Sequence, residues 1–169
     1  MINSGFFLNI LRFILLVLTQ VMVFNNLNFF GFINPLVYIL FLYWYPVKQT
    51  RTTFLAISFL LGLCVDIFSD TVAINAAASV TGAYFRPVLM RFIFGVNYDF
   101  QSFKLRNTTK AQQFTFLLFL ISVHHFTYFT LEIFSLRDSF IVLKRTLVIV
   151  PATLLFCTLF ISLFSTQKE

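Results

Sequence analysis

Six long apolar stretches dominate this sequence and set narrow limits on how it can fold. They cover residues 6–24, 33–45, 53–68, 72–94, 114–134 and 140–164. A transmembrane helix needs about 20 consecutive, mostly apolar residues. The polar/apolar alternation of a membrane β-barrel is absent. The sequence therefore predicts a single all-α integral membrane domain, a compact bundle of about six transmembrane helices.

The second stretch, 33–45, is the shortest of the six. Asn34 and Pro35 form a turn signal at its start, with proline suited to a first helical turn. Tyr43, Trp44 and Tyr45 form an aromatic cluster at its end, and such amphipathic rings favour the headgroup level of a membrane. We expect a short transmembrane helix here, and a re-entrant segment is the alternative.

The composition supports the membrane assignment. Of 169 residues, 59% are hydrophobic and 11% are charged, and the mean hydropathy is +0.90. A soluble domain of about 150 residues still exposes roughly a third of the surface of its unfolded chain, so it could not hide this much apolar surface. The net charge of +6 fits basic cytoplasmic loops, and no basic segment is long enough to bind nucleic acid.

The distribution of charge predicts the orientation. Basic residues follow the second and fourth stretches, whereas the connection between the third and fourth holds Asp66 and Asp70 and no base. Because basic loops stay cytoplasmic, we expect both termini in the cytoplasm. Arg137, Lys144 and Arg145 are the exceptions to this pattern.

A polar motif runs from the third stretch into the fourth. Gly62 and Asp66 are four residues apart and share one helix face, which Asp70 continues if the helix persists. A carboxylate at the end of a span is costly unless it is paired or hydrated. For Asp66 we weigh a contact that locks helices or a partner against a capping role at the membrane surface. For Asp70 we expect an N-cap of the helix over 72–94, and a contact that locks helices or binds a partner is the alternative.

Small residues mark the first half of that fourth helix. Ala78 and Gly82, and Ser79 and Ala83, are four residues apart. Small residues at this spacing let helix backbones approach closely in lipid. They predict internal packing of the bundle, and the alternative is a surface on which the span of a partner docks.

Other polar residues within the apolar stretches suggest structural roles. Arg86 and Arg91 are expected to extend to the membrane interface. His124 and His125 point about 100° apart on a helix, so we expect each to hydrogen bond a neighbouring helix and not to share a metal. Glu132 should pair with Lys144 or Arg145, because an unpaired charge in lipid is costly.

The sequence contains no catalytic or cofactor-binding constellation. It has no glycine-rich phosphate loop, no nucleophile elbow and no cysteine or histidine spacing typical of metal sites. Cys64 and Cys157 lie within apolar stretches and fit small buried side chains. We therefore expect a protein that is not an enzyme and binds no cofactor or metal.

The order of the motifs resembles the rod shape-determining protein MreD family, in its Bacteroidetes-type form. The resemblance rests on residues 33–38, 45–46, 62–71, 75–78 and 86–87, and it spans about 33–91. Hydropathy alone extends it to the rest of the chain. One departure is Ala73, where family members usually carry a glycine just before the small-residue run.

The resemblance implies a function and partners. MreD proteins are non-enzymatic, multi-pass proteins of the bacterial inner membrane that support cell shape and side-wall peptidoglycan synthesis. They bind the single-span protein MreC, and through it MreB, RodA and a class B penicillin-binding protein. Their bundle is similar to the substrate-binding subunits of energy-coupling-factor vitamin transporters. This similarity supplies the alternative function of a solute-binding membrane subunit.

Overall fold

The chain is folded almost entirely into helices. The computed structural model describes residues 4–27, 34–47, 49–95, 98 and 103–164, and within these ranges there is no β-strand. The long helices are α1 (Ser4–Thr19), α4 (Arg51–Ser69), α5 (Ile74–Phe94), α6 (Lys110–Ile133) and α7 (Ser139–Phe164). The short elements are η1 (Gln20–Phe24), α2 (Asn25–Leu27), η2 (Val37–Ile39), α3 (Leu40–Trp44), η4 (Leu105–Asn107) and η5 (Leu136–Asp138).

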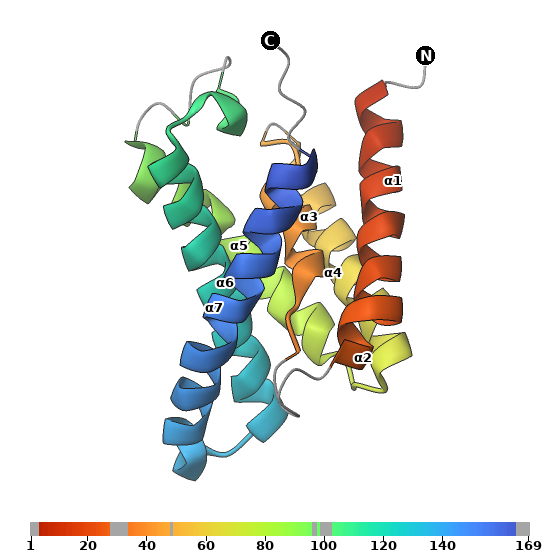
Figure 1. Cartoon of the computed structure of the whole chain (residues 1–169), viewed down its shortest axis with the longest axis vertical. Helices are drawn as coiled ribbons and strands as arrows, with labels where there is room; N and C mark the ends of the chain where they lie inside the picture. Colours follow the sequence, from red (N-terminus) through yellow and green to blue (C-terminus); the bar gives the residue numbers. More distant parts are fainter. Residues whose placement is uncertain (1–3, 28–33, 48, 96–97, 99–102, 165–169) are drawn as a thin grey trace.

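The helices form a bundle with two distinct ends (Figure 1). The start of α1, the start of α6 and the end of α7 lie together, and we call this the termini end. Helix α2, the α4–α5 turn and the α6–α7 turn lie at the opposite end. The chain therefore starts and finishes on the same side of the bundle.

Within the described residues, four helices are long and apolar enough to cross a membrane: Gly5–Leu27, Arg51–Ser69, Lys110–Ile133 and Ser139–Phe164. They coincide with four of the six apolar stretches. Helix α5 has 21 residues but is not among the four, because polar residues such as Asn75, Ser79 and Arg86 interrupt it.

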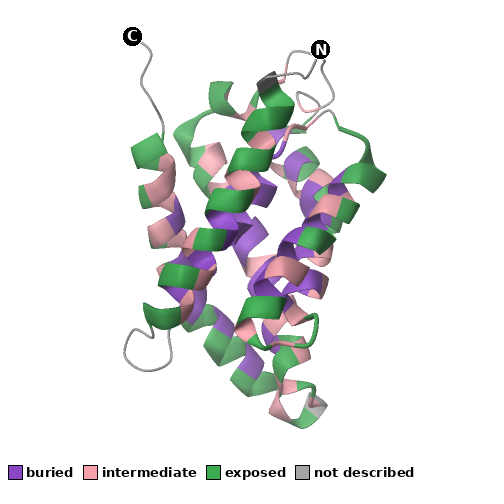
Figure 2. Cartoon of the chain, turned by 90° about the vertical axis from the view of Figure 1, so that its right-hand side faces the viewer, coloured by how far each residue is buried: buried purple, intermediate pink, exposed green. Residues whose placement is uncertain are grey.

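The outer surface of the bundle is apolar. Exposed residues follow the outer faces of the helices along their whole length, while buried residues line the inside (Figure 2). Many of the exposed residues are large hydrophobic ones, among them Phe7 at 65%, Met22 at 70% and Leu147 at 66%. Apolar faces this extensive are stable in lipid and not in water. The chain is thus an all-α membrane protein.

The second apolar stretch is not a continuous helix, and that prediction was wrong. Residues 34–36 are not helical, and the eight helical residues of η2 and α3 are too few to span a bilayer as a helix. The segment lies inside the bundle, where every residue from Leu36 to Tyr43 is at most 8% exposed. Non-helical backbone is tolerated at membrane depth only when protein surrounds it.

The aromatic cluster at the end of this segment also differs from expectation. Tyr43 and Tyr45 are 4% and 5% exposed and contact Phe116 and Phe54, with ring centroids 5.6 and 4.6 Å apart. These two rings pack inside the bundle and are not exposed on its outer surface. The pattern of rings alone did not distinguish an interfacial belt from an aromatic core.

Candidate functional site

Asp66 connects α4 to the start of α5. Its Oδ1 accepts hydrogen bonds from the Asn75 backbone N–H and side-chain amide, both at 3.0 Å, and from the Thr71 hydroxyl. Its Oδ2 accepts from the Ala76 N–H at 2.8 Å. The side chain is 2% exposed. A carboxylate is favoured here because the first N–H groups of a helix lack partners and carry partial positive charge. This is an interhelical contact of the kind suggested by the sequence.

Asp70 does not cap α5, which corrects the predicted N-cap. It is the exposed C-cap of α4, in the left-handed conformation with φ 54°. The N-cap position of α5 belongs to Ala73, which has φ 57° and makes no side-chain capping bond. The chain turns too tightly for Asp70 to reach the helix start, and Asp66 supplies the capping oxygens from one turn earlier.

Gly62 lets the same two helices touch through their backbones. A Cβ atom at this position would lie 2.4 Å from the Ala76 Cα and 2.4 Å from the Asn75 carbonyl oxygen. Any side chain would therefore collide with backbone atoms that have little freedom to move. Gly62 and Asp66, four residues apart on α4, together fix the α4–α5 junction.

The run of small residues on α5 also packs inside the bundle. Ala78, Ser79 and Ala83 are at most 1% exposed, and Gly82 is buried. A Cβ atom on Gly82 would lie 3.3 Å from the Leu42 side chain. These residues make room for the buried segment 34–44 and for α6. The stripe is therefore covered by the chain itself, and docking of a partner on it was the wrong alternative.

A buried polar chain continues from the α4–α5 junction. The Tyr38 hydroxyl donates to Asn75 Oδ1 at 3.0 Å and lies 2.8 Å from His124 Nε2. Because the single hydroxyl proton of Tyr38 goes to Asn75, His124 Nε2 is the protonated nitrogen and donates to Tyr38. The other nitrogen, His124 Nδ1, has no partner among the described residues. The chain links α6, the 34–44 segment and α5 to Asp66.

His125 is linked to the non-helical residues 34–36 through Thr153. Its Nδ1 is 3.0 Å from the Ile121 carbonyl oxygen, so Nδ1 carries the proton. Its Nε2 can then accept from the Thr153 hydroxyl, at 3.1 Å. The Thr153 oxygen in turn accepts from the Leu36 N–H at 3.3 Å. Both histidines thus hydrogen bond neighbouring elements, as predicted.

Gln20 binds the same segment from the first helix. Its amide donates to the Pro35 carbonyl at 3.2 Å and its oxygen accepts from the Val37 N–H at 2.7 Å. Gln20 begins the wider turn η1, and such π-turns often occur at functional positions. Its amide also donates to Asn25, which donates to Ser69 on α4.

These contacts define the buried polar network, made of Gln20, Tyr38, Asp66, Asn75, His124, His125 and Thr153. Its members come from η1, η2, α4, α5, α6 and α7. Asp66 and the histidines were candidates from the sequence, Tyr38 and Asn75 entered only as members of the resembling motifs, and Gln20 and Thr153 were not predicted. The available signal was their polarity inside apolar stretches, which is costly in lipid unless hydrogen bonds satisfy it.

Arg86 is buried, which corrects the predicted interfacial position. It is 4% exposed, and its guanidinium donates to the Tyr45 carbonyl oxygen at 2.5 Å. The guanidinium also lies 5.0 Å from the centre of the Phe54 ring. Arg86 satisfies backbone carbonyls just beyond α3. Arg91, five residues later, is exposed, and its place at the membrane interface stays a prediction.

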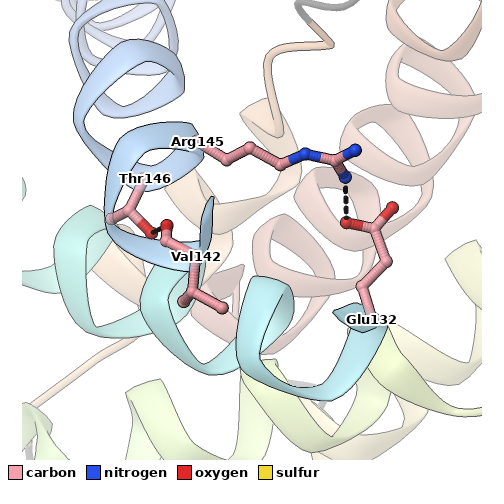
Figure 3. A network of polar contacts seen from close by, with 4 residues as sticks. All are labelled: Glu132, Val142, Arg145 and Thr146. Carbon is pink, nitrogen blue, oxygen red and sulfur yellow. Dashed lines mark hydrogen bonds and ion pairs between the residues drawn. The ribbon is translucent and has the colours of Figure 1, made fainter. Parts of the chain in front are cut away.

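The α6–α7 turn is closed by an ion pair at the opposite end. Arg145 and Glu132 lie 2.9 Å apart (Figure 3), which confirms one of the two predicted partners of Glu132. The side chains are 51% and 36% exposed. Exposed pairs of this kind contribute about 0–1 kcal/mol, so the pair adds little to stability.

An apolar groove lies between α5, α6 and α7. It has a volume of about 740 Å³, and Phe85, Phe126, Leu147 and Pro151 are among its lining residues. Four hydroxyl residues also line it: Thr81, Ser122, Thr127 and Thr146. Each of these hydroxyls donates to the carbonyl four residues earlier in its own helix. The groove therefore offers an occupant mainly hydrocarbon.

Comparison with protein-family models, curated proteins and solved structures finds no match for this chain.

Replacing Tyr38 with phenylalanine tests the buried polar network. The change removes the hydroxyl that joins Asn75 and His124 and leaves Asn75 Oδ1 and the His124 ring without a partner in the core, while the Asn75 amide keeps its bond to Asp66. We expect a loss of about 2 kcal/mol in the free energy of unfolding, because an orphaned buried polar group costs about 1–3 kcal/mol. Thermal unfolding of the purified protein in detergent measures the loss. Tyr84→Phe, at a 51% exposed position, is the control and should be neutral.

Proposed function

We propose that this protein is an MreD-type scaffold of the bacterial inner membrane. In this role it is not an enzyme. It holds an MreC-type single-span protein and, through it, MreB, RodA and a class B penicillin-binding protein during cell elongation. The observation that carries the proposal is the motif around residues 62–78, on which the resemblance rests.

The motif residues work as one structural unit. Gly62 lies against the backbone of Ala76, and Asp66 binds the first N–H groups of α5. Asn75 continues the contact to Tyr38 in the 33–38 motif. The shared residues therefore build a rigid core and are hydrogen bonded to one another. A rigid core of this kind suits a protein that presents fixed surfaces to its partners, as the proposal requires.

We further propose six membrane crossings with both termini in the cytoplasm. The segment 34–44 counts as the second crossing, shielded from lipid by the other helices, and α5 counts as the fourth. The termini end carries Arg51, Arg91, Lys104, Arg106 and Lys110. Basic segments of this kind remain on the cytoplasmic side. Asp66 and Asp70 lie at the opposite end, which would face the periplasm.

The α5–α6–α7 groove is the surface we assign to the partner helix. Its hydroxyls are bonded within their own helices, so an apolar helix can pack there without leaving polar groups unsatisfied. The alternative function, a solute-binding membrane subunit, requires several free polar groups that converge on a solute. Because its hydroxyls are already bonded, this groove suits a partner helix better than a polar solute.

Filling the groove tests the scaffold proposal. Ser122→Phe places a large ring in the groove, and we expect recovery of the MreC-type partner to fall by about tenfold, as for loss of a central interface contact. The abundance of the protein should stay unchanged. The measurement is co-purification from cells that depend on this protein for rod shape, with quantification of both proteins.

Leu159→Phe is the matched control, because Leu159 lies on α7 at a 51% exposed position outside the groove. It should preserve partner recovery and cell shape. Normal partner recovery with Ser122→Phe would reject the groove as the docking surface. A purified protein that carries or transports a small solute without any partner would support the solute-binding alternative instead.

A further inference from the structure

A second cavity lies at the termini end, between the start of α6 and the end of α7. Its volume is about 570 Å³. Residues from three helices line it, including Tyr43, Lys110, Gln113, Phe114, Ile161 and Ser162. It is distinct from the α5–α6–α7 groove in its lining residues and in its chemistry, because polar and apolar side chains share its wall.

The free polar groups of this cavity are hydrogen-bond donors. Among the described residues, the Lys110 ammonium and the hydroxyls of Ser162 and Tyr43 have no hydrogen-bond or ion-pair partner. Tyr43 is 4% exposed, so its unpartnered hydroxyl belongs to a buried wall of the cavity. By contrast, the Gln113 amide already donates to the Thr108 carbonyl at 2.9 Å. The Lys110 ammonium can only donate, and the two hydroxyls can donate to the same ligand, so the set fits an anionic, oxygen-rich ligand.

The charged residues around the cavity are also positive, which favours an anionic ligand. The described residues of the termini end include Arg91, Lys104, Arg106 and Lys110 and no carboxylate. Lys110 is also the first residue of α6, where the helix dipole favours negative charge. In Figure 1 the described carboxylates belong to elements at the opposite end of the bundle.

Apolar side chains continue the cavity away from Lys110. Phe114 is one helical turn farther along α6 and is 49% exposed, and Ile161 faces the cavity from α7. A bilayer places phosphate groups at its surface and acyl chains directly beneath them. The arrangement of Lys110 followed by Phe114 matches that order from the end of the bundle inward.

We propose that this cavity binds one anionic phospholipid. Its phosphate accepts hydrogen bonds from Lys110, Ser162 and Tyr43, and one acyl chain lies against Phe114 and Ile161. A headgroup with net negative charge is preferred over a zwitterionic one, because the described wall offers a cation and no carboxylate to pair with an amine. The site is independent of the proposed scaffold function.

Native mass spectrometry of the full-length protein tests the proposal. Protein in mixed micelles with equal phosphatidylglycerol and phosphatidylethanolamine should retain one phosphatidylglycerol in preference. Lys110→Gln should lower this retention about fivefold, since a basic residue near a membrane surface contributes about 1 kcal/mol to binding anionic lipid. Tyr43→Phe should lower it by a similar factor while keeping its ring contact with Phe116.

The control is Arg106→Gln, an exposed residue of the same end that does not line the cavity. It should leave retention unchanged. An equal loss of retention for Arg106→Gln and Lys110→Gln would show that the lipid is held by general electrostatic attraction to the basic surface and not by the cavity. Equal retention of the two lipids would overturn the headgroup assignment, and displacement by soluble glycerol phosphate would show a free-anion site. If Tyr43→Phe lowers the melting temperature, Ser162→Ala serves as the test variant in its place. Unchanged lipid retention with Ser162→Ala would then reject the site.

Discussion

Gly62→Ala is expected to break the packing of α4 against α5, one of the two largest losses of stability among the single substitutions considered. The added methyl group would lie 2.4 Å from the backbone of both Asn75 and Ala76. Backbone at a helix start cannot rotate away as a side chain can, so the helices must separate. We expect a loss of about 3 kcal/mol, at the upper end of overpacking costs. This corresponds to a fall of roughly 6–12 °C in the melting temperature.

Two other glycines provide matched controls for this experiment. A Cβ atom on Gly5 would meet nothing within 4 Å, and one on Gly82 would meet the movable tip of Leu42 at 3.3 Å. Gly5→Ala should be neutral and Gly82→Ala should cost much less than Gly62→Ala. Thermal unfolding of the three purified variants gives the comparison. Equal melting temperatures for the Gly62 and Gly5 variants would show that the α4–α5 contact is not close.

The hydropathy pattern predicted the long helices because a spanning helix must be apolar along its whole length. The same rule failed for 33–45. A short helical segment with a non-helical start, surrounded by protein, has similar apolar content but needs partners for its free backbone groups. Those partners, Gln20 and Thr153, are 17 and 117 residues from the groups they bind at Val37 and Leu36. Local sequence patterns do not predict contacts between residues this far apart in the chain.

The sequence identified single polar residues as important, but it did not predict where their side chains lie or which groups they bind. Asp66 lies near the end of the 53–68 apolar stretch, and an interhelical contact was one of the two roles weighed for it. Arg86 looked like an interfacial residue, because a long basic side chain about two turns before a helix end can still reach water. The structure instead supplies Arg86 with the free Tyr45 carbonyl beyond the short α3. That acceptor exists because α3 ends inside the bundle, a tertiary feature that local sequence does not encode.

Ala73, in the turn between α4 and α5, is a position where a departure in the sequence coincides with unusual backbone geometry. The chain has alanine where the resembling family usually has glycine, and Ala73 adopts φ 57°. Glycine reaches this left-handed conformation at lower cost than any other residue. The sequence departure thus marks a strained backbone position. Asp66, which binds the N–H groups just after this turn, helps to hold that conformation.

Asp66→Asn is expected to weaken the same junction through electrostatics and not through shape. The carboxylate accepts four hydrogen bonds, two of them from the N–H groups of Asn75 and Ala76. An amide of the same size keeps one oxygen but turns an NH₂ group toward one of these donors. One backbone N–H then remains buried without a partner, and the charge at the helix start is lost. We expect a cost of about 3 kcal/mol, since an unsatisfied buried group costs about 1–3 kcal/mol and a helix-dipole contact adds up to about 2.

Asp70→Asn is the matched control, because it makes the same chemical change four residues later. Asp70 is exposed, and asparagine tolerates its left-handed backbone. Thermal unfolding should separate the two variants by roughly 6–12 °C, with Asp70→Asn close to wild type. Partner recovery distinguishes structure from recognition: if Asp66 acts through the fold, partner recovery should fall only in proportion to the folded protein that remains. A variant at Asp66 that melts like wild type but loses its partner would instead place this carboxylate in direct contact with the partner.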